Sequence, residues 1–348
     1  MSIGHNKVPR HGSLRAVVTG GSGVLGRAIA SRLLDNGWQV RILDIARPPA
    51  ECIQAEFVQV DIEKDFTSIE RVAELVSGFT HVFHLAARLP QAGLDEAGFL
   101  AANVEPTRKL ALASADAGIQ RFVYASSIEI YGAQPMHIPL DEDAELHFTG
   151  AYSRNKWECE ELLRKIRLEK GLSVVMLRMP MIFGPGFYHE RSILTTFKLL
   201  QHGLPIPLPA ADAPVSFVSA RDAAQAFELA SLSVEADGES FNVAAPDIPT
   251  MMEHMWQVAI KVGSRSKPFA IPAWTTKAIE GFARKKAKKP GARLFGTPAE
   301  LISFIGTGGA FSIEKARRIL DYSPLDSCSD AWANTYKWYY ATSAASRK

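Results

Sequence analysis

The sequence has few cysteines and lacks any long apolar run, and both shortages limit what the chain can be. Cysteine occurs only at Cys52, Cys159 and Cys328 in 348 residues. An odd number of widely spaced cysteines indicates neither a disulfide framework nor a metal-ligand motif, and it is typical of a reducing cytoplasm. No apolar stretch reaches the roughly 18 residues of a membrane-spanning helix, and the polar start has no signal-peptide core. We therefore expect a soluble, cytoplasmic protein with no metal site.

An excess of charge of one sign is also lacking. Lys and Arg number 39 and Asp and Glu 37, for a formal net charge of +2, so nothing points to a nucleic-acid partner. The one basic cluster, Arg284 to Lys289, we interpret first as the solvated end of a helix. The alternative is a weak contact of Lys285 to Lys289 with an anionic membrane surface. With 47% hydrophobic and 22% charged residues, the composition predicts one large α/β domain with a smaller lobe.

Near the start of the chain an apolar run breaks into closely spaced glycines. Leu14 to Val18 supplies the apolar and β-branched run of a buried strand. A helical pattern then begins at Val24 and Leu25 and stops at Asn36-Gly37. The segment therefore predicts a strand, a tight turn and a helix.

Each of the three glycines in that turn has a distinct expected role. Gly20 permits the tight turn, Gly23 lets a phosphate approach the backbone, and Gly26 lets the helix pack close to the strand. The free N–H groups and the positive end of the helix would then face a pyrophosphate. Because the glycines are spaced three and three rather than two and three, the loop alone is a weak signal, and a chance glycine-rich turn is the alternative.

The next strand strengthens the dinucleotide interpretation. Gln39 to Leu43 ends in Asp44, about 20 residues after the loop, where a carboxylate can accept from both ribose hydroxyls of an adenosine. The same charge would repel a 2′-phosphate, so NAD is favoured over NADP. Arg47 keeps NADP open, because it could turn toward a phosphate if Asp44 moved away.

Strand and helix patterns continue to alternate up to about residue 180. The expected strands span residues 57–62, 81–85, 121–125 and 173–178, and the expected helices span 67–76, 95–117 and 151–170. This alternation predicts a parallel, doubly wound sheet whose ligands gather at the carboxyl ends of the strands. Residues expected at the cofactor along that edge are Asp61, Ile62, Leu85, Ala86, Ala87 and Ser126.

Tyr152 and Lys156 are four residues apart, so on a helix they occupy one face. A cationic neighbour stabilises a phenolate, so the ammonium of Lys156, helped by an oxidised nicotinamide, would make Tyr152 a usable base near neutrality. Ser127, at the end of the preceding strand, would hold the substrate oxygen. The alternative is a half-buried tyrosine and a solvated lysine with no chemical role.

The later part of the chain is expected to form a substrate-covering lobe. The domain boundaries we predict are a flexible tail at 1–13, a nucleotide-binding core at 14–180, a lobe at 181–340 whose segment 215–243 returns to the core, and a flexible tail at 341–348. Helices are expected at 193–201, 222–231, 251–262, 273–284, 298–304, 312–320 and 331–340, with a loop at 204–214. Trp332, Tyr336 and Tyr339 we interpret as packing residues.

Taken together, the motifs resemble those of the extended short-chain dehydrogenase/reductases, from about residue 14 to 340. They are the glycine loop, Asp44, Asp61, His84-Leu85-Ala86-Ala87, Asn103-Val104, Ser126-Ser127 before Tyr131-Gly132, Tyr152 with Lys156, and Leu177-Arg178-Met179-Pro180 before Gly184-Pro185-Gly186.

That resemblance implies an NAD-dependent enzyme in which Ser127, Tyr152 and Lys156 are catalytic. It also implies that Asn103 and Pro180 contact the cofactor, and that the chain forms a homodimer through a four-helix contact that includes the Tyr-Lys helix. Pro106 stands where the family usually has glycine, which leaves only the local helix geometry in doubt.

Two positions separate this chain from the nucleotide-sugar branch of that family. Epimerases and dehydratases typically carry Asn and Arg where this chain has Met181 and Val215, so two polar contacts to a nucleotide diphosphate are missing. The surrounding sequence is instead similar to the branch of 3β-hydroxysteroid dehydrogenases and dihydroflavonol-4-reductase-like enzymes. Substrate contacts are therefore expected from Arg88, Ser127, Met181, Phe183, Phe187 and Tyr188, although the apolar ones among them could equally be core.

The first hypothesis is thus an NAD-dependent oxidoreductase that interconverts a secondary alcohol and a ketone on a fairly apolar small molecule. A nucleotide-sugar epimerase or dehydratase is the alternative, since the same apparatus serves both reactions. A non-catalytic dinucleotide sensor is the alternative from another class, but a sensor has no need of a proton-transfer set.

Overall fold

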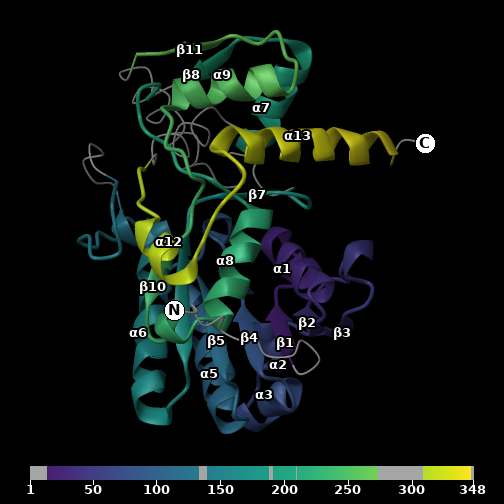
Figure 1. The fold of residues 1–348 in the computed structure, drawn as a ribbon, viewed down its shortest axis with the longest axis vertical. Coiled ribbons are helices and arrows are strands. Elements are labelled where there is room, and N and C mark those ends of the chain that lie inside the picture. The colour runs from purple at the N-terminus through teal and green to yellow at the C-terminus, as the bar shows by residue number, and fades with distance from the viewer. Residues whose placement is uncertain (1–13, 133–138, 188–190, 209, 273–308, 346–348) are drawn as a thin grey trace, which may run out of the picture.

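A seven-stranded parallel sheet forms the centre of the molecule (Figure 1). The computed structural model describes residues 14–132, 139–187, 191–208, 210–272 and 309–345. In order across the sheet, the strands are β10 (Ser240–Asn242), β6 (Val174–Met179), β5 (Arg121–Ser127), β4 (His81–His84), β1 (Arg15–Thr19), β2 (Gln39–Asp44) and β3 (Glu56–Gln59). All neighbours pair in parallel. The doubly wound fold expected from the sequence is confirmed, with the reversal of strand order between β1 and β4.

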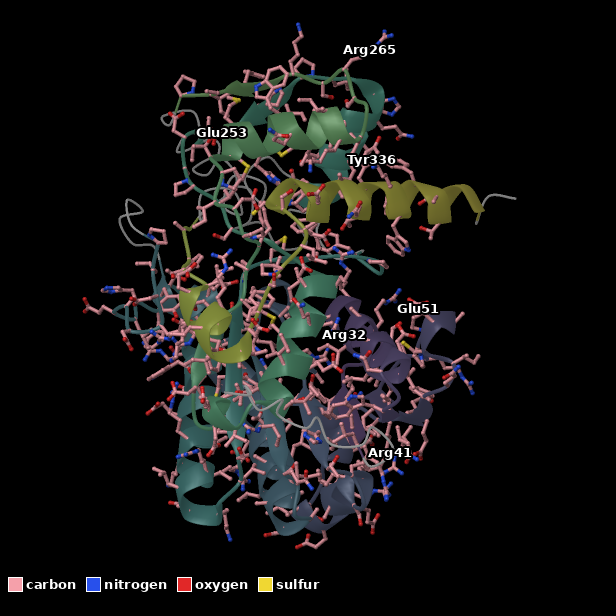
Figure 2. All side chains as sticks on the ribbon, in the orientation of Figure 1. Arg32, Arg41, Glu51, Glu253, Arg265 and Tyr336 are labelled. Atoms are coloured by element: carbon pink, nitrogen blue, oxygen red, sulfur yellow. The ribbon has the colours of Figure 1, made fainter. Side chains whose placement is uncertain are left out.

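Helices cover both faces of this sheet (Figure 1). Consecutive residues of β1 show the division, since Val18 faces the core with α1 and α8 whereas Val17 faces the core with α3, α5 and α6. Arg32, labelled in Figure 2, pairs with Glu228 at 2.6 Å and ties α1 to α8. The helices around the sheet are α1 (Val24–Asp35), α2 (Ile62–Asp65), α3 (Ile69–Val76), α4 (Glu96–Phe99), α5 (Glu105–Asp116), α6 (Ala151–Lys170), α8 (Ala220–Leu232) and α12 (Glu314–Leu320).

A smaller lobe lies beyond the carboxyl ends of the strands (Figure 1). It contains β7 (Ile182–Phe183), β9 (Val218–Ser219), β8 (Ile206–Leu208), β11 (Pro268–Ala270), α7 (Arg191–His202), α9 (Met251–Lys261) and α13 (Cys328–Ala345). Its core is aromatic: the ring of Phe197 lies 6.1, 5.4 and 5.9 Å from those of Trp332, Tyr336 and Tyr339. These three residues therefore pack as expected.

Four predictions from local sequence patterns were wrong. The expected loop 204–214 contains β8, whose partner β11 lies some sixty residues away and leaves no local signal. The strand expected to reach residue 62 ends at Gln59, because Asp61 caps α2. The helix expected over 95–117 is interrupted by a π-turn at Leu100–Val104, just before Pro106, which lacks the N–H of a regular helix. Helix α13 continues to Ala345, into the expected tail. The expected helices 273–284 and 298–304, the tail 1–13 and the basic cluster 284–289 lie outside the described residues.

Three buried histidines make the fold sensitive to acid. Burial lowers the pKa of His81 to about 4 and the pKa values of His84 and His254 to about 3, whereas an unfolded histidine titrates near 6.5. Between those values the unfolded chain binds protons that the folded chain does not. The stabilising effect of these neutral histidines is therefore complete above about pH 6.5 and is lost as the pH falls below it.

Replacing His254 by phenylalanine is expected to weaken this acid sensitivity. Its ring packs against Phe217 and Trp332, and neither ring nitrogen has a hydrogen-bond partner in the described part of the chain. In urea titrations between pH 6.5 and 4, the free energy of unfolding of His254→Phe should fall less steeply than that of the wild type, by up to about 1.4 kcal/mol per pH unit. The exposed His202, changed to glutamine, is the control, and equal slopes for His254→Phe and wild type would contradict the expectation.

Candidate active site

Two positions, Gly20 in the turn after β1 and Gly26 in the first turn of α1, accept only glycine. Gly20 has φ +70°, and a Cβ on it would lie 2.9 Å from the amide nitrogen of Ala86. A Cβ on Gly26 would lie 2.1 Å from the Gly20 carbonyl oxygen, far inside van der Waals contact. These distances account for the tight turn at Gly20 and for the close approach of α1 to the strand at Gly26.

The start of α1 fits a pyrophosphate. Gly23 occupies the N-cap position, and no side chain there caps the first N–H groups of the helix. The Gly23 amide donates to the Gly20 carbonyl at 3.1 Å and fixes the turn before the helix. The first helical residues, Val24, Leu25 and Gly26, thus present backbone donors and the positive end of the helix dipole, the arrangement that binds phosphate groups.

Asp44 lies beside this loop at the end of β2. Its carboxylate accepts hydrogen bonds from the amides of Ser22, at 2.9 Å, and Ala46, at 3.0 Å. The charge is therefore held next to the glycine turn. Arg47 is exposed, and its guanidinium lies over the ring of Phe57, 5.9 Å from the ring centroid. In the chain alone, the contact of Arg47 is therefore with an aromatic ring.

The segment after β4 continues the same edge of the sheet. Leu85, Ala86 and Ala87 are all partly exposed. The amides of Leu85 and Ala86 donate to Oγ1 of Thr19 at 3.1 and 3.2 Å, and Thr19 also bonds the buried ring of His84 at 2.7 Å. The ends of β1 and β4 are thus joined beside the glycine loop through Thr19, whose hydrogen-bonding role could not be predicted from its place in the loop motif.

Three further residues expected near the ligands bond to protein partners. Asp61 accepts from the amide of Glu63 at 3.1 Å and pairs with Lys64 at 2.8 Å, whose hydrogen bond lowers the pKa of Asp61; Ile62 beside it is buried. The side chain of Arg88 pairs with Glu63. The buried Asn103 accepts from the Arg88 amide at 2.7 Å and donates to the Arg88 carbonyl at 3.0 Å. Its side chain therefore fixes the backbone of the segment after β4.

Ser127, Tyr152 and Lys156 come together at the carboxyl end of β5. Ser127 is the last residue of β5, and the other two lie one turn apart on α6. Oγ of Ser127 accepts from the Glu129 amide at 3.2 Å, and the Ser127 side chain lies near enough to the Tyr152 phenol to lower its pKa. Nζ of Lys156 lies 5.8 Å from the centre of the Tyr152 ring and donates to the Ala125 carbonyl at 2.8 Å. Ser127 thus forms one group with two residues that follow it by 25 and 29 positions in the chain.

The electrostatics of this group differ from the sequence expectation. Burial raises the pKa of Tyr152 above its ordinary value, the charge of Glu129 raises it further, and the nearby Ser127 side chain opposes the rise only in part. Burial also lowers the pKa of Lys156 to about 8. Proximity of a lysine was expected to make the phenol acidic. In the chain alone, desolvation of the phenol decides the direction in which the pKa of Tyr152 shifts.

Other residues expected at the ligands occupy the protein interior. The Ser126 hydroxyl donates to Glu160 at 2.6 Å rather than toward the cofactor edge, and Pro180 is buried directly after β6. Phe183 and Phe187 were expected at the substrate, but they stack with ring centres 5.0 Å apart and are 1% and 5% exposed in the lobe core. Their burial favours the alternative that these apolar residues belong to the core, because aromatic residues serve packing as readily as binding. Met181 is partly buried against the same core, and Tyr188 lies outside the described residues.

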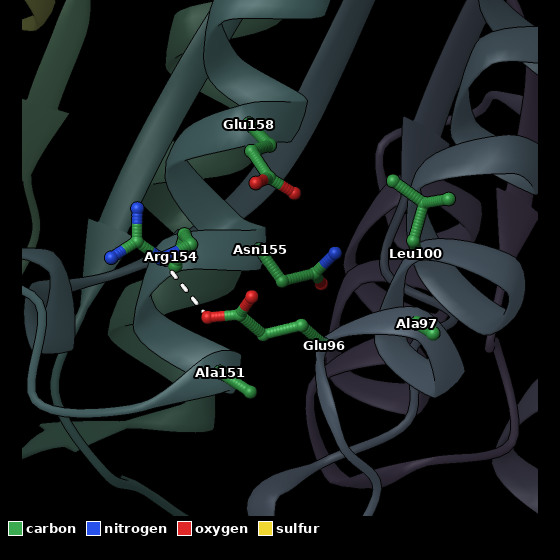
Figure 3. A pocket seen from close by; sticks show the side chains of 7 residues that line it. All are labelled: Glu96, Ala97, Leu100, Ala151, Arg154, Asn155 and Glu158. Atoms are coloured by element: carbon green, nitrogen blue, oxygen red, sulfur yellow. Dashed lines mark ion pairs between the residues drawn. The ribbon is translucent and has the colours of Figure 1, made fainter.

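A pocket of about 190 Å³ lies between α4 and the start of α6 (Figure 3). It is lined by Glu96, Ala97, Leu100, Ala151, Arg154, Asn155 and Glu158. Figure 3 shows Glu96 and Arg154 facing each other across it, with an ion pair of 3.3 Å. Neither Tyr152 nor Lys156 lines this pocket, so it does not coincide with the proton-transfer group.

The described residues form neither a metal-binding cluster nor a membrane-spanning helix. Among those residues, no three His, Cys, Asp or Glu side chains gather in a way that could hold a metal ion. Within the same part of the chain, no helix combines the length and the apolar character needed to cross a bilayer.

Comparison with known proteins identifies the family. The model of the NAD dependent epimerase/dehydratase family matches residues 16–244, from β1 to the end of the central sheet. The chain belongs to the NAD-dependent epimerase/dehydratase family. Its extended short-chain dehydrogenase/reductase motifs and its parallel sheet agree with that assignment, and membership makes it an NAD-dependent enzyme.

The proteins that this chain resembles include one named as uncharacterized, one named as a dehydrogenase and one named as an epimerase. The chain is 32% identical over 334 residues to the uncharacterized protein y4nG of Sinorhizobium fredii, covering 95% of this chain and 80% of that one. It is 26% identical over 348 residues to a 3-beta-hydroxysteroid dehydrogenase of Mycolicibacterium neoaurum, covering 93% and 91%. A solved UDP-glucuronic acid 4-epimerase from Bacillus cereus, in complex with UDP-glucuronic acid and NAD, shares the fold at 18% identity and a TM-score of 0.74, covering 94% and 100%.

Proposed function

We propose that this member of the epimerase/dehydratase family is an NAD-dependent oxidoreductase that interconverts a secondary alcohol and a ketone on a fairly apolar small molecule. The substrate classes we have in view are hydroxysteroids, flavonoid-like ketones and hydrophobic hydroxy acids. One observation carries the proposal: Ser127, Tyr152 and Lys156 meet at the carboxyl end of β5, on the edge of the sheet where the glycine loop fits a pyrophosphate.

The roles of these residues follow from their chemistry. During oxidation Tyr152 takes the proton of the substrate hydroxyl, and during reduction it returns one to the carbonyl oxygen. Ser127 donates to the same substrate oxygen and holds it beside the phenol. The ammonium of Lys156 stabilises the phenolate and is placed to bind the nicotinamide ribose. Bound NAD would supply the hydride acceptor and, when oxidised, a positive charge that offsets the cost of forming a buried phenolate.

Two side chains of the lobe favour an apolar substrate over a nucleotide sugar. Val215 is 2% exposed, and its amide donates to the Pro249 carbonyl at 2.9 Å. Met181 is partly buried against the lobe core. Neither side chain supplies a polar contact at the two positions where nucleotide-sugar enzymes have Asn and Arg, so a diphosphate would be left with fewer partners.

A nucleotide-sugar epimerase is the second candidate. The fold it shares with the UDP-glucuronic acid 4-epimerase favours it, and the same proton-transfer group would serve. A non-catalytic sensor of dinucleotides has less support, because binding alone needs neither Tyr152 nor Lys156.

A substrate panel tests the proposal. Hydroxysteroids with NAD, and flavonoid-like ketones or the keto forms of hydrophobic β-hydroxy acids with NADH, should change the nicotinamide absorbance. UDP- and dTDP-sugars should not. Efficient epimerisation of a nucleotide sugar with no net formation of NADH would reverse the ranking of the two candidates.

Asp44 is expected to set the cofactor preference. The wild-type protein should bind NAD more tightly than NADP, and Asp44→Ala with Arg47 retained should narrow the ratio of the two dissociation constants by about tenfold or more, because a charged acceptor and a repulsion are lost together. Asp44→Asn, which keeps a side-chain acceptor but no charge, should give an intermediate ratio. Titration of protein fluorescence with each cofactor measures these ratios. Equal affinity of the wild type for NAD and NADP would contradict the assignment.

A further inference from the structure

A buried ion pair lies one helical turn beyond Lys156. Glu160 of α6 is fully buried, and Arg178 of β6 is 3% exposed. Nε of Arg178 donates to Oε1 of Glu160 at 3.0 Å, and Nη2 donates to Oε2 at 2.8 Å. Such a bidentate pair fixes the orientation of both side chains as well as their charges.

Ser126 connects this pair to the strand that carries Ser127. Its Oγ donates to Oε1 of Glu160 at 2.6 Å, and in the register of β5 and β6 it lies opposite Arg178. Ser127 is the next residue along the strand. Glu160 is therefore bonded to the strand end that presents Ser127, while its own helix presents Tyr152 and Lys156.

Further donors complete the surroundings of the Glu160 carboxylate. Nη2 of Arg164 donates to Oε2 at 2.8 Å, and Oγ of Ser240 donates to the same oxygen at 3.3 Å. Burial opposes the ionised form, but the hydrogen bonds from Arg178 and the neighbouring charges hold the pKa of Glu160 below its ordinary value. A buried carboxylate with this many donors is a rigid anchor.

We propose that Glu160 is a positioning residue for the proton-transfer group: acting through Ser126 and Arg178, it holds Ser127 in place beside Tyr152. The inference rests on the function proposed above. Loss of the anchor loosens the serine relative to the phenol, and misplacement of this kind by about 1 Å can cost about 10²-fold in rate.

The chain contains a matched tie at the other end of β6. Asp237 accepts from Nη2 of Arg167 at 2.9 Å, from Oγ of Ser173 at 2.6 Å and from the Val174 amide at 3.2 Å. It thus links α6 to the sheet as Glu160 does, but at the start of the strand instead of at the site. A variant of Asp237 reports what the loss of a helix-to-sheet tie does by itself.

The test compares Ser126→Ala and Glu160→Gln with Asp237→Asn in the full-length protein. Ser126→Ala removes only the link to the catalytic strand and leaves the ion pair, so it remains informative if Glu160→Gln folds poorly. We expect kcat to fall about 10-fold in Ser126→Ala and about 10²-fold in Glu160→Gln, with the NAD dissociation constant within about twofold of the wild type. Asp237→Asn should lower the thermal midpoint of unfolding but leave kcat within about twofold of the wild-type value.

Two results would overturn the inference. One is a kcat for Ser126→Ala and Glu160→Gln no lower than that of Asp237→Asn. The other is independent of any substrate: crystal structures of the wild type and of Ser126→Ala in which Ser127 and Tyr152 occupy the same relative positions. Absence of turnover by the wild type with every substrate class would contradict the proposed function instead, and the structural comparison would then decide the role of Glu160.

Discussion

Replacing Tyr152 with phenylalanine is expected to lower kcat by about 10²-fold or more on a verified substrate, because the group that takes and returns the proton is lost. The ring is kept, so its edge-to-face contact with Phe99 at 5.9 Å should persist. Binding of NAD should barely change. Steady-state kinetics and cofactor titration measure the two effects separately.

Two comparisons make this result specific. Tyr336→Phe alters a tyrosine that packs against Phe197 in the lobe and should leave kcat at the wild-type value. Ser127→Ala should cost less than Tyr152→Phe, since a hydrogen bond to the substrate oxygen is lost but the proton acceptor remains. Near-wild-type turnover by Tyr152→Phe would return Tyr152 to the role of a packing residue.

Replacing Lys156 with methionine is expected to lower both kcat and the affinity for NAD. Methionine keeps much of the length of the side chain but removes the charge that stabilises the phenolate and the donor expected at the nicotinamide ribose. We expect kcat and the affinity for NAD each to fall by about tenfold or more. Kinetics and cofactor titration again give the two numbers.

The stability of this variant separates a chemical role from a structural one. Burial lowers the pKa of Lys156 to about 8, so keeping its ammonium in the interior costs free energy at neutral pH. Lys156→Met should therefore have a thermal midpoint no lower than the wild type. Lys109→Met is the matched control, because Nζ of Lys109 also donates to a backbone carbonyl, that of Phe66 at 2.7 Å, and its loss should leave activity unchanged. Retained activity and NAD affinity in Lys156→Met would contradict the role assigned to Lys156.

Much of the nucleotide-binding half could be predicted because its signals are local. The apolar run before Gly20 and the helical pattern after Val24 correspond to β1 and α1, and the spacing of Tyr152 and Lys156 places both on one face of α6. Parallel topology then brings distant strand ends to one edge. That rule places Ser127 at the ligand edge of the sheet, and the family resemblance joins it to Tyr152 and Lys156 as one catalytic group.

What could not be predicted depends on contacts between distant segments. The pairing of β8 with β11 and the ion pair of Glu160 with Arg178 leave no periodic trace in the sequence. Burial is likewise a tertiary property, so a motif does not reveal that the pKa of Tyr152 rises in the chain alone. The spacing of Glu160, four residues after Lys156 on the same helix, was a signal that could have been used.

The fate of a carbon-bound deuterium distinguishes net oxidation of an alcohol from epimerisation of a sugar. A hydroxysteroid or hydroxy acid that carries deuterium on its carbinol carbon is incubated with the protein and excess NAD, and the nicotinamide and organic products are analysed by mass spectrometry. We expect deuterium to accumulate in released NADH in step with formation of the ketone, and Tyr152→Phe to slow both together. Transfer of no deuterium from any such alcohol, together with return of carbinol deuterium to the inverted carbon of a nucleotide sugar, would contradict the proposed function.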